Sequence, residues 1–266
     1  MLRSELRHLF RRLRTRALLI VLTAIPVLIA VAVRLSNGPE AGRGPAFLDQ
    51  VTHNGVFAAL AGLTIVVPFF LPLTVAVVSG DTISGEASFG TLRYLLARPV
   101  GRSRLLAAKF ATAMTFCVAA ALAVAIGGLV AGVILFPVGR VTTLSGLTLP
   151  LADGLLRILA AALVVGVSML GLAAVGLFAS TLTEVPVGAM AATAGIAIAS
   201  QILDAIPQLH SIHGLLFSHH WFSFGDLMRS PVSWTAIERD LLLQVGWVAV
   251  FGAAAWARFT TKDVLA

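Results

Sequence analysis

Long apolar runs alternate with short polar segments along this chain. Residues 56–79 form a run of 24 uncharged, mostly apolar residues, and residues 110–136 form another of 27. Because an α-helix needs about 20 apolar residues to cross a bilayer, each run is long enough to span a membrane. Applied to the whole chain, the same criterion predicts six spans, at residues 17–35, 56–79, 105–136, 158–182, 185–206 and 241–257.

The polar segment between the second and third spans, residues 80–104, has the pattern of a short helix. Residues 86–96 contain good helix formers, and the apolar side chains on one face are Phe89, Leu92 and Leu96. Pro99 predicts where this helix stops. Basic residues gather around its end and the start of the third span: Arg93, Arg98, Arg102, Arg104 and Lys109. We therefore expect an amphipathic helix held at a membrane surface.

The N-terminal residues 1–16 also predict an amphipathic helix. Apolar positions recur at the helical spacing i, i+4, i+7 and i+11, at Leu2, Leu6, Leu9 and Leu13. The segment is strongly basic and includes Arg7, Arg11 and Arg14. A basic start before an apolar run is also typical of a secretory signal. The long basic region and the periodic leucines favour a helix lying in the membrane interface.

The composition agrees with a membrane protein, since 58% of the residues are hydrophobic and only 12% are charged. Soluble domains contain roughly 25% charged residues. The net charge of +7 does not indicate nucleic acid as a partner, because no soluble module is present to bind it. If both termini are cytoplasmic, 13 of the 19 basic residues fall in cytoplasmic segments. Basic residues favour the cytoplasmic side, so this bias predicts that orientation.

Two prolines, Pro68 and Pro72, lie inside the second span. Each removes a backbone donor, so the helix is expected to kink or to unwind locally. The kink fits either simple packing or a hinge beside a translocation cavity. Small residues one turn apart predict close helix contacts, within the chain or in a dimer. Such pairs occur in the third and fifth spans: Gly128 and Gly132, Gly188 and Ala192, Ala191 and Gly195.

The sequence lacks the common patterns of catalysis and nucleotide binding. Its two lysines, Lys109 and Lys262, follow Ala108 and Thr261, so the chain has no phosphate-binding loop of the form G-x-x-x-x-G-K-[ST]. It also has no H-E-x-x-H motif, and the single cysteine, Cys117, lies in an apolar run. We expect no catalytic residues, no bound cofactor and no cysteine-based metal site.

Polar residues near the ends of the fifth span allow two interpretations. His210 and His213 have a spacing that puts both on one helical face, and imidazole is a common metal ligand. A polar loop with interfacial aromatic residues also explains these histidines, together with His219 and His220, and is favoured. Asp204 and Glu184 fit an ion pathway, but placement in the membrane interface is the simpler account.

Residues 80–110 resemble the signature of ABC-2-type permeases, the membrane subunits of a class of ABC exporters. The family pattern is an acidic residue closing the second span, followed by Gly-Glu, Gly-Thr-Leu, Leu-x-x-Pro, Arg and Lys. In this sequence the pattern reads Asp81, Gly85-Glu86, Gly90-Thr91-Leu92, Leu96 to Pro99, Arg102 and Lys109. The rest of the chain resembles the family in architecture, with a basic N-terminal helix, six spans and a longer outer loop with short helices at 207–240.

The resemblance implies an all-α protein with six transmembrane helices in a bacterial cytoplasmic membrane, with both termini inside. Two copies, in a homo- or heterodimer, would form the translocation pathway of an ATP-driven exporter. ATP and Mg²⁺ would bind to two separate ATPase subunits, and this chain would carry no catalysis itself. Its coupling helix would contact the ATPase through residues near the second span: Asp81, Glu86, Phe89, Leu92, Arg93 and Arg102.

The resemblance also gives roles to residues outside the coupling helix. Arg7, Arg11 and Arg14 would rest on the inner leaflet. The substrate path would lie near the bend of the second span and the small residues of the fifth: Pro68, Pro72, Gly188 and Ala192.

Two other functions remain open at this stage. An ion-coupled secondary transporter would show charged groups at mid-membrane and recognisable halves, whereas spans two to five have no mid-span charge and no evident repeat. A membrane enzyme or anchor that transports nothing would need a catalytic cluster, and the sequence contains none that we recognise. The apolar walls of the predicted spans do not indicate a substrate.

Overall fold

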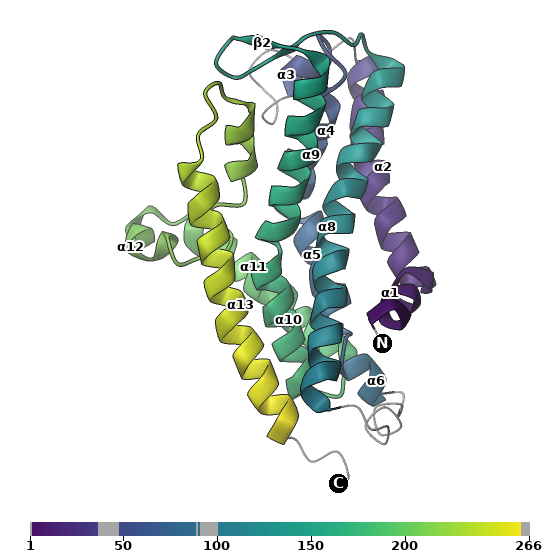
Figure 1. Ribbon diagram of the computed structural model, residues 1–266, viewed down its shortest axis with the longest axis vertical. Coiled ribbons are helices and arrows are strands. Elements are labelled where there is room, and N and C mark those ends of the chain that lie inside the picture. Colours follow the sequence, from purple (N-terminus) through teal and green to yellow (C-terminus); the bar gives the residue numbers. More distant parts are fainter. Residues whose placement is uncertain (1, 37–47, 89, 91–100, 262–266) are drawn as a thin grey trace.

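The computed structural model describes residues 2–36, 48–88, 90 and 101–261, which form a tall bundle of long helices (Figure 1). The long apolar helices are α2 (Leu13–Leu35), α4 (Phe57–Val66), α5 (Phe70–Gly80), α8 (Arg102–Leu135), α9 (Leu151–Ser168), α10 (Leu170–Leu182), α11 (Pro186–Asp204) and α13 (Thr235–Thr261). The short helices are α1 (Leu2–Arg11), α3 (Leu48–Val51), α6 (Ser84–Ser88), η1 (Pro207–Leu209), α12 (His210–His213) and η2 (Ser223–Met228). Strands β1 (Val141–Thr142) and β2 (Thr148–Leu149) pair antiparallel.

The described helices include five or six candidate spans, compared with the six predicted. Five helical stretches are long and apolar enough to cross a membrane, and α4 with α5 makes a sixth when the bent pair counts as one span. The ends differ from the prediction: α2 begins at Leu13 and α13 at Thr235, before their apolar runs. Polar residues near a membrane surface can continue a helix, so hydropathy underestimates helix length.

The second span is broken, as the two prolines predicted. Helices α4 and α5 meet at an angle of 60° around residues 67–69. Proline has no N–H and its ring clashes with the preceding turn, so the regular helix cannot pass through Pro68 unchanged. Pro68 and Pro72 face α11, where they line a narrow gap with Ala194 and Ala197.

The fourth span is also interrupted, at Met169, although it contains no proline. Backbone groups freed at such a break need partners when no water is nearby. The N–H of Gly171 donates to Oε1 of Gln244 at 3.1 Å, and the indole Nε1 of Trp221 donates to the carbonyl of Ser168 at 3.1 Å. Side chains from later parts of the chain therefore stabilise this break.

Asp240 extends the same polar network. It is fully buried near the start of α13, and its carboxylate contacts the hydroxyl of Ser168. Nε2 of Gln244 donates both to Oδ1 of Asp240 and to the carbonyl of Phe217, each at 3.0 Å. The network joins α13 to the interrupted fourth span. Asp240 was expected in the preceding loop, because the apolar run of the last span starts only at residue 241.

Helix α8 lies at the centre of the bundle and packs against α2, α4 and α9. Its two small residues allow close contact with the start of α4. A Cβ atom at Gly128 would lie 2.6 Å from Cα of Ala59, and one at Gly132 would lie 1.9 Å from the carbonyl oxygen of Gly55. The close contact expected for the third span is therefore an intrachain one. By contrast, Gly188 on α11 is exposed.

Replacing Asp240 by leucine is expected to destabilise the fold. Ser168 and Gln244 would lose a buried partner, and Gln244 would be oriented less firmly toward the break in the fourth span. We expect a loss of about 1–2 kcal/mol, seen as a lower midpoint of thermal unfolding for the detergent-solubilised chain. Glu238→Leu, at an exposed position two residues earlier, is the matched control. Equal midpoints for Asp240→Leu and the unmodified chain would show that the network adds no stability.

Candidate functional site

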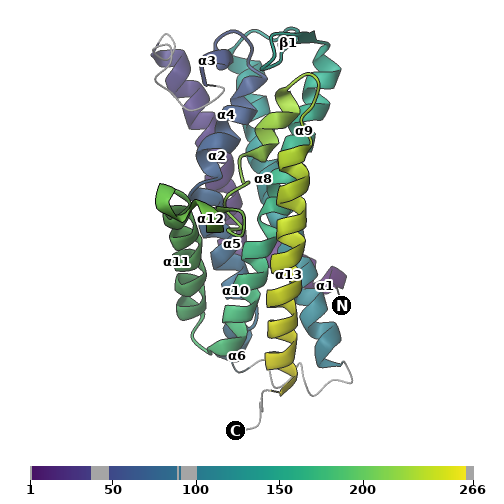
Figure 2. The same cartoon turned by 90° about the vertical axis from the view of Figure 1, so that its left-hand side faces the viewer.

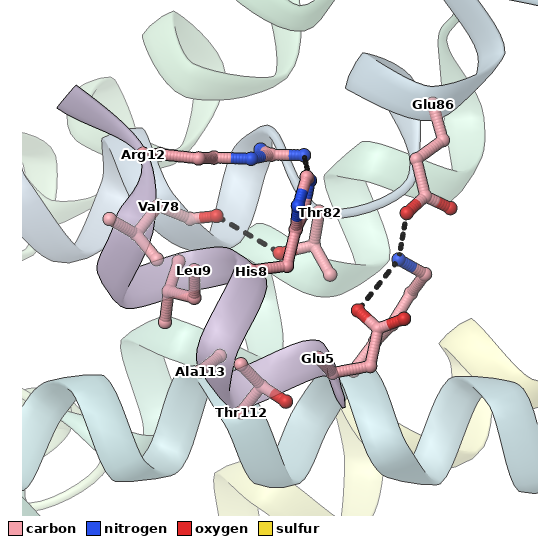
Figure 3. Close-up of a pocket in the computed structure, with 10 residues that line it drawn as sticks. Glu5, His8, Leu9, Arg12, Val78, Thr82, Glu86, Thr112 and Ala113 are labelled. Atoms are coloured by element: carbon pink, nitrogen blue, oxygen red, sulfur yellow. Dashed lines mark hydrogen bonds and ion pairs between the residues drawn. The ribbon is translucent and has the colours of Figure 1, made fainter. Parts of the chain in front are cut away.

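Three helices that are far apart in sequence meet toward one end of the bundle. They are the N-terminal helix α1, the short helix α6 that follows the second span, and the first turns of α8 (Figures 1 and 2). Lys109 of α8 lies between the other two, and its side chain is only 3% exposed. Its Nζ lies 2.5 Å from Oε1 of Glu86 on α6 and 3.6 Å from Oε2 of Glu5 on α1. Both contacts are drawn as dashed lines that end at the labelled Glu86 and Glu5 in Figure 3.

The three charges form one interaction that depends on all three helices. A buried ammonium group is costly unless acidic partners surround it. Glu86 and Glu5 supply these partners, and their side chains are themselves only 13% and 20% exposed. Movement of α6 or α1 would therefore change the environment of Lys109 directly.

A second ion pair connects the end of α5 with the junction of α1 and α2. Nη1 of Arg12 donates to Oδ2 of Asp81 at 3.0 Å, and Nη1 of Arg14 lies 3.7 Å from the same oxygen. Nη2 of Arg14 also contacts the sulfur of Met190 on α11 at 2.9 Å. A Cβ atom at Gly85 would lie 2.6 Å from Oδ1 of Asp81, so glycine leaves room for this carboxylate.

The start of α6 is fixed by α10. Oγ of Ser180 accepts hydrogen bonds from the backbone N–H groups of Ile83 and Ser84, at 2.8 and 2.9 Å. These N–H groups lie at a helix start, where no partner exists within the helix itself. Ile83 is buried against Leu177 and Phe259. The segment that follows the second span is therefore attached to the bundle at its first residues.

Arg102 attaches the start of α8 to the end of α13. Its Nη1 donates to the carbonyl of Thr260 at 3.1 Å and lies 3.5 Å from the carbonyl of Phe259. Carbonyl groups at a helix C-terminus lack partners within the helix and carry a partial negative charge, so a guanidinium group stabilises them.

A small cavity with polar and apolar walls lies beside Lys109. Its volume is about 40 Å³, and its lining includes Glu5, His8, Arg12, Thr82 and Glu86 (Figure 3). This volume suits an ordered water molecule rather than a substrate. The site is therefore a junction of helices, and its chemistry is that of ion pairing.

The helix expected at 86–96 differs from the structure where the structure describes it. Helix α6 covers Ser84–Ser88, and Gly90 has a φ of +67°. An α-helix ends at a residue in this left-handed conformation, so no regular helix runs from Glu86 through Gly90. Phe89, Leu92 and Arg93, which were expected to contact a partner, lie outside the described residues.

The arginines of the N-terminal segment fall into two groups. Arg12 and Arg14 contact Asp81, whereas Arg7 and Arg11 are exposed on α1. The exposed pair lines a shallow surface together with Arg3.

The four histidines of the 207–220 region do not form one group. Figures 1 and 2 show α12 beside the bundle, about halfway along its long axis. His213 and His219 approach Asp204, whereas His210 is exposed. Burial lowers the pKa of the His220 imidazole, and the nearby His219 and Arg239 lower it further.

Sequence reasoning missed Glu5, Arg12 and Ser180 as parts of this site. One signal was available: Glu5 is the sole acidic residue before Glu40, in a strongly basic segment. An isolated acid in such surroundings indicates a specific cationic partner.

Comparison with known proteins identifies the family. The profile described as "ABC-2 family transporter protein" matches residues 2–264. A relative named "Probable ABC transporter permease protein NosY" from Stutzerimonas stutzeri is 33% identical over 129 residues, which cover 45% of this chain and 45% of the relative. The protein with the same name from Pseudomonas aeruginosa is 42% identical over 67 residues, which cover 25% of this chain and 24% of that relative.

The chain therefore belongs to the ABC-2 transporter family. Its class is that of a multi-pass membrane permease, as the resemblance of residues 80–110 indicated. The chain spans less than half the length of the two curated relatives it matches.

Replacing Lys109 by methionine is expected to destabilise the junction of α1, α6 and α8. The carboxylates of Glu5 and Glu86 would remain close together and largely buried without their cation, which should cost about 3 kcal/mol. Thermal unfolding in detergent measures the loss, and Arg7→Met, at an exposed position on α1, is the control.

The triple variant Lys109→Met, Glu5→Gln and Glu86→Gln separates charge from shape. It removes all three charges at nearly constant volume, so it should recover most of the lost stability. If the triple variant is as unstable as Lys109→Met alone, the ion pairs are not the cause.

Proposed function

We propose that this chain is the permease subunit of an ATP-driven ABC exporter, and that it acts as a dimer with two separate ATPase subunits on the cytoplasmic side. Family membership and the permease names of the two relatives support this proposal. In this arrangement ATP and Mg²⁺ bind to the ATPase subunits, and the present chain carries no catalytic residue.

Family membership carries the proposed function, and the position of Lys109 between Glu86 and Glu5 supports a mechanism of coupling. In the proposed exporter, the segment after α5 contacts the ATPase, with Phe89, Leu92 and Arg93 as its contact residues. When the ATPase displaces this segment, the Glu86–Lys109 pair transmits the movement to α8. The Lys109–Glu5 pair transmits it to α1. Asp81 and Arg12 transmit the same movement to the start of α2.

The proposed orientation places both termini in the cytoplasm of a bacterial cell, with the spans in its cytoplasmic membrane. Helix α1 then lies at the inner leaflet. Arg7 and Arg11, which are exposed, face anionic lipid headgroups, and Arg14 instead pairs with Asp81.

The proposed substrate path runs beside the bend of the second span and α11. Pro68 and Pro72 break the regular helix at this point, and they line a gap against α11. Gly188 and Ala192 are exposed on α11 and leave room beside that helix. These features support a path along apolar walls without indicating the chemical class of the substrate.

Co-purification tests the proposed partnership. The tagged chain is extracted in a mild detergent from its native host, and associated proteins are identified by mass spectrometry. We expect a phosphate-loop ATPase in a ratio near 1:1, and Arg93→Ala or Phe89→Ala should reduce the recovered ATPase at least fivefold. Arg140→Ala is the matched control, because Arg140 is exposed next to the β-hairpin at the opposite end of the bundle (Figure 1).

Two results would contradict the proposal. Equal loss of the ATPase with Arg140→Ala would show that the 80–104 segment is not the docking site. Absence of any ATPase from a folded, membrane-inserted chain would make ion-coupled transport the favoured function, and the buried Asp240 would then be the first candidate for an ion-binding group.

A further inference from the structure

Three potential metal ligands meet where α11 ends. Asp204, His213 and His219 each offer one ligand atom, and these atoms all lie within 4.8 Å of one another. The side chains are 27%, 15% and 34% exposed, in the same order, so the cluster lies at the surface of the chain.

Local folding brings the two imidazole groups together. The N–H of Leu216 donates to the carbonyl of His213 at 3.0 Å, and the N–H of His219 donates to the carbonyl of Leu216 at 3.0 Å. These successive turns fold the chain back, so the ring centroids of His213 and His219 are 5.6 Å apart. Nδ1 of each ring faces the same oxygen, Oδ1 of Asp204.

The hydrogen bond of His213 fixes which of its nitrogens is available. Its Nε2 lies 3.1 Å from the carbonyl oxygen of Ile206. A carbonyl oxygen can only accept, so Nε2 carries the proton, and Nδ1 of the neutral ring presents a lone pair. Nδ1 lies 3.8 Å from Oδ1 of Asp204, too far for a hydrogen bond. Histidine ligands of metals typically donate their second nitrogen to a carbonyl or carboxylate in this way.

The two Nδ1–Oδ1 distances lie on either side of the separation between ligand atoms in a tetrahedral metal site. Bonds of about 2.0–2.1 Å to a tetrahedral ion place two ligand atoms about 3.3 Å apart. Nδ1 of His219 lies 2.5 Å from Oδ1 of Asp204, and Nδ1 of His213 lies 3.8 Å from it. Changes of less than about 1 Å through side-chain rotation satisfy both distances. Binding through Nδ1 of His219 requires that the hydrogen between this atom and Asp204 leaves that position. A neutral ring meets this requirement by carrying its hydrogen on Nε2 instead, and an imidazolium ring meets it by releasing one proton.

We propose that Asp204, His213 and His219 bind one divalent transition-metal ion of the Zn²⁺ type. Two imidazoles and one carboxylate suit such ions, whereas Ca²⁺ and Mg²⁺ prefer oxygen ligands alone. A water molecule would fill the remaining position of the tetrahedron. The bound ion connects the end of α11 to the segment that contains α12, and so restrains the part of the chain that follows the fifth span.

Metal titration of the full-length chain tests this site. The chain is prepared in lipid nanodiscs with an affinity tag that contains no histidine, stripped with a chelator, and titrated with Zn²⁺ by calorimetry. We expect one saturable ion per chain. His219→Gln and Asp204→Asn should each weaken the affinity at least tenfold. His210→Gln is the matched control and should change it less than twofold, because His210 contributes no atom to the cluster.

The titration either supports or overturns the proposed metal site. His213→Gln provides a second ligand variant if thermal unfolding shows that His219→Gln is misfolded. Absence of saturable binding in the unmodified chain, or equal weakening by His210→Gln, would overturn the proposal, the latter by showing nonspecific binding to surface histidines. The titration needs no ATPase, so its result is independent of the proposed exporter function.

Discussion

Polar groups inside an apolar bundle need partners from the same chain, and this requirement decides which helices are neighbours. Apolar side chains pack nearly as well against lipid as against one another, so they select partners weakly. The ammonium group of Lys109 pairs with the carboxylate of Glu86. The freed N–H of Gly171 donates to Gln244, and the first N–H groups of α6 donate to Ser180. Each of these contacts joins helices that are distant in sequence. Together they fix α6, α8, α10 and α13 relative to one another.

The two kinds of polar contact have different mechanical consequences. The network around Asp240 is fully buried and stabilises a break that is already present, so it favours one arrangement. The contacts of Lys109 are unequal, since Glu86 is 2.5 Å away and Glu5 is 3.6 Å away. A shift of α6 away from α8 leaves Glu5 as a nearby alternative partner, so the ammonium group need not become unpaired. Such a shift would keep α1 and α8 joined through Glu5 and Lys109, whereas the largely buried Glu86 carboxylate would lose its cation.

Sequence reasoning recovered the features that depend on local chemistry. The apolar runs predicted the five or six candidate spans that the described helices form. Pro68 and Pro72 predicted the break between α4 and α5, because a missing N–H acts at its own position. The break at Met169 was not predictable, since the side chains that satisfy its freed backbone groups, Gln244 and Trp221, come from distant parts of the sequence. The Lys109–Glu5 pair likewise depends on the packing of α1 against α8. Ion pairs between distant segments leave no periodic signal in the sequence. The isolated acidic residue Glu5 in a basic segment did indicate a cationic partner.

Two sets of small residues that look alike in sequence have opposite environments. On α8, Gly128 and Gly132 lie against the backbone at the start of α4, and larger side chains would collide there. On α11, Gly188 and Ala192 are exposed, and a Cβ atom at Gly195 would meet no other atom of the described chain within 4 Å. The face of α8 that carries Gly128 and Gly132 is therefore covered by the start of α4. The small residues of α11 therefore leave space beside the proposed substrate path, whereas those of α8 serve contacts within the chain.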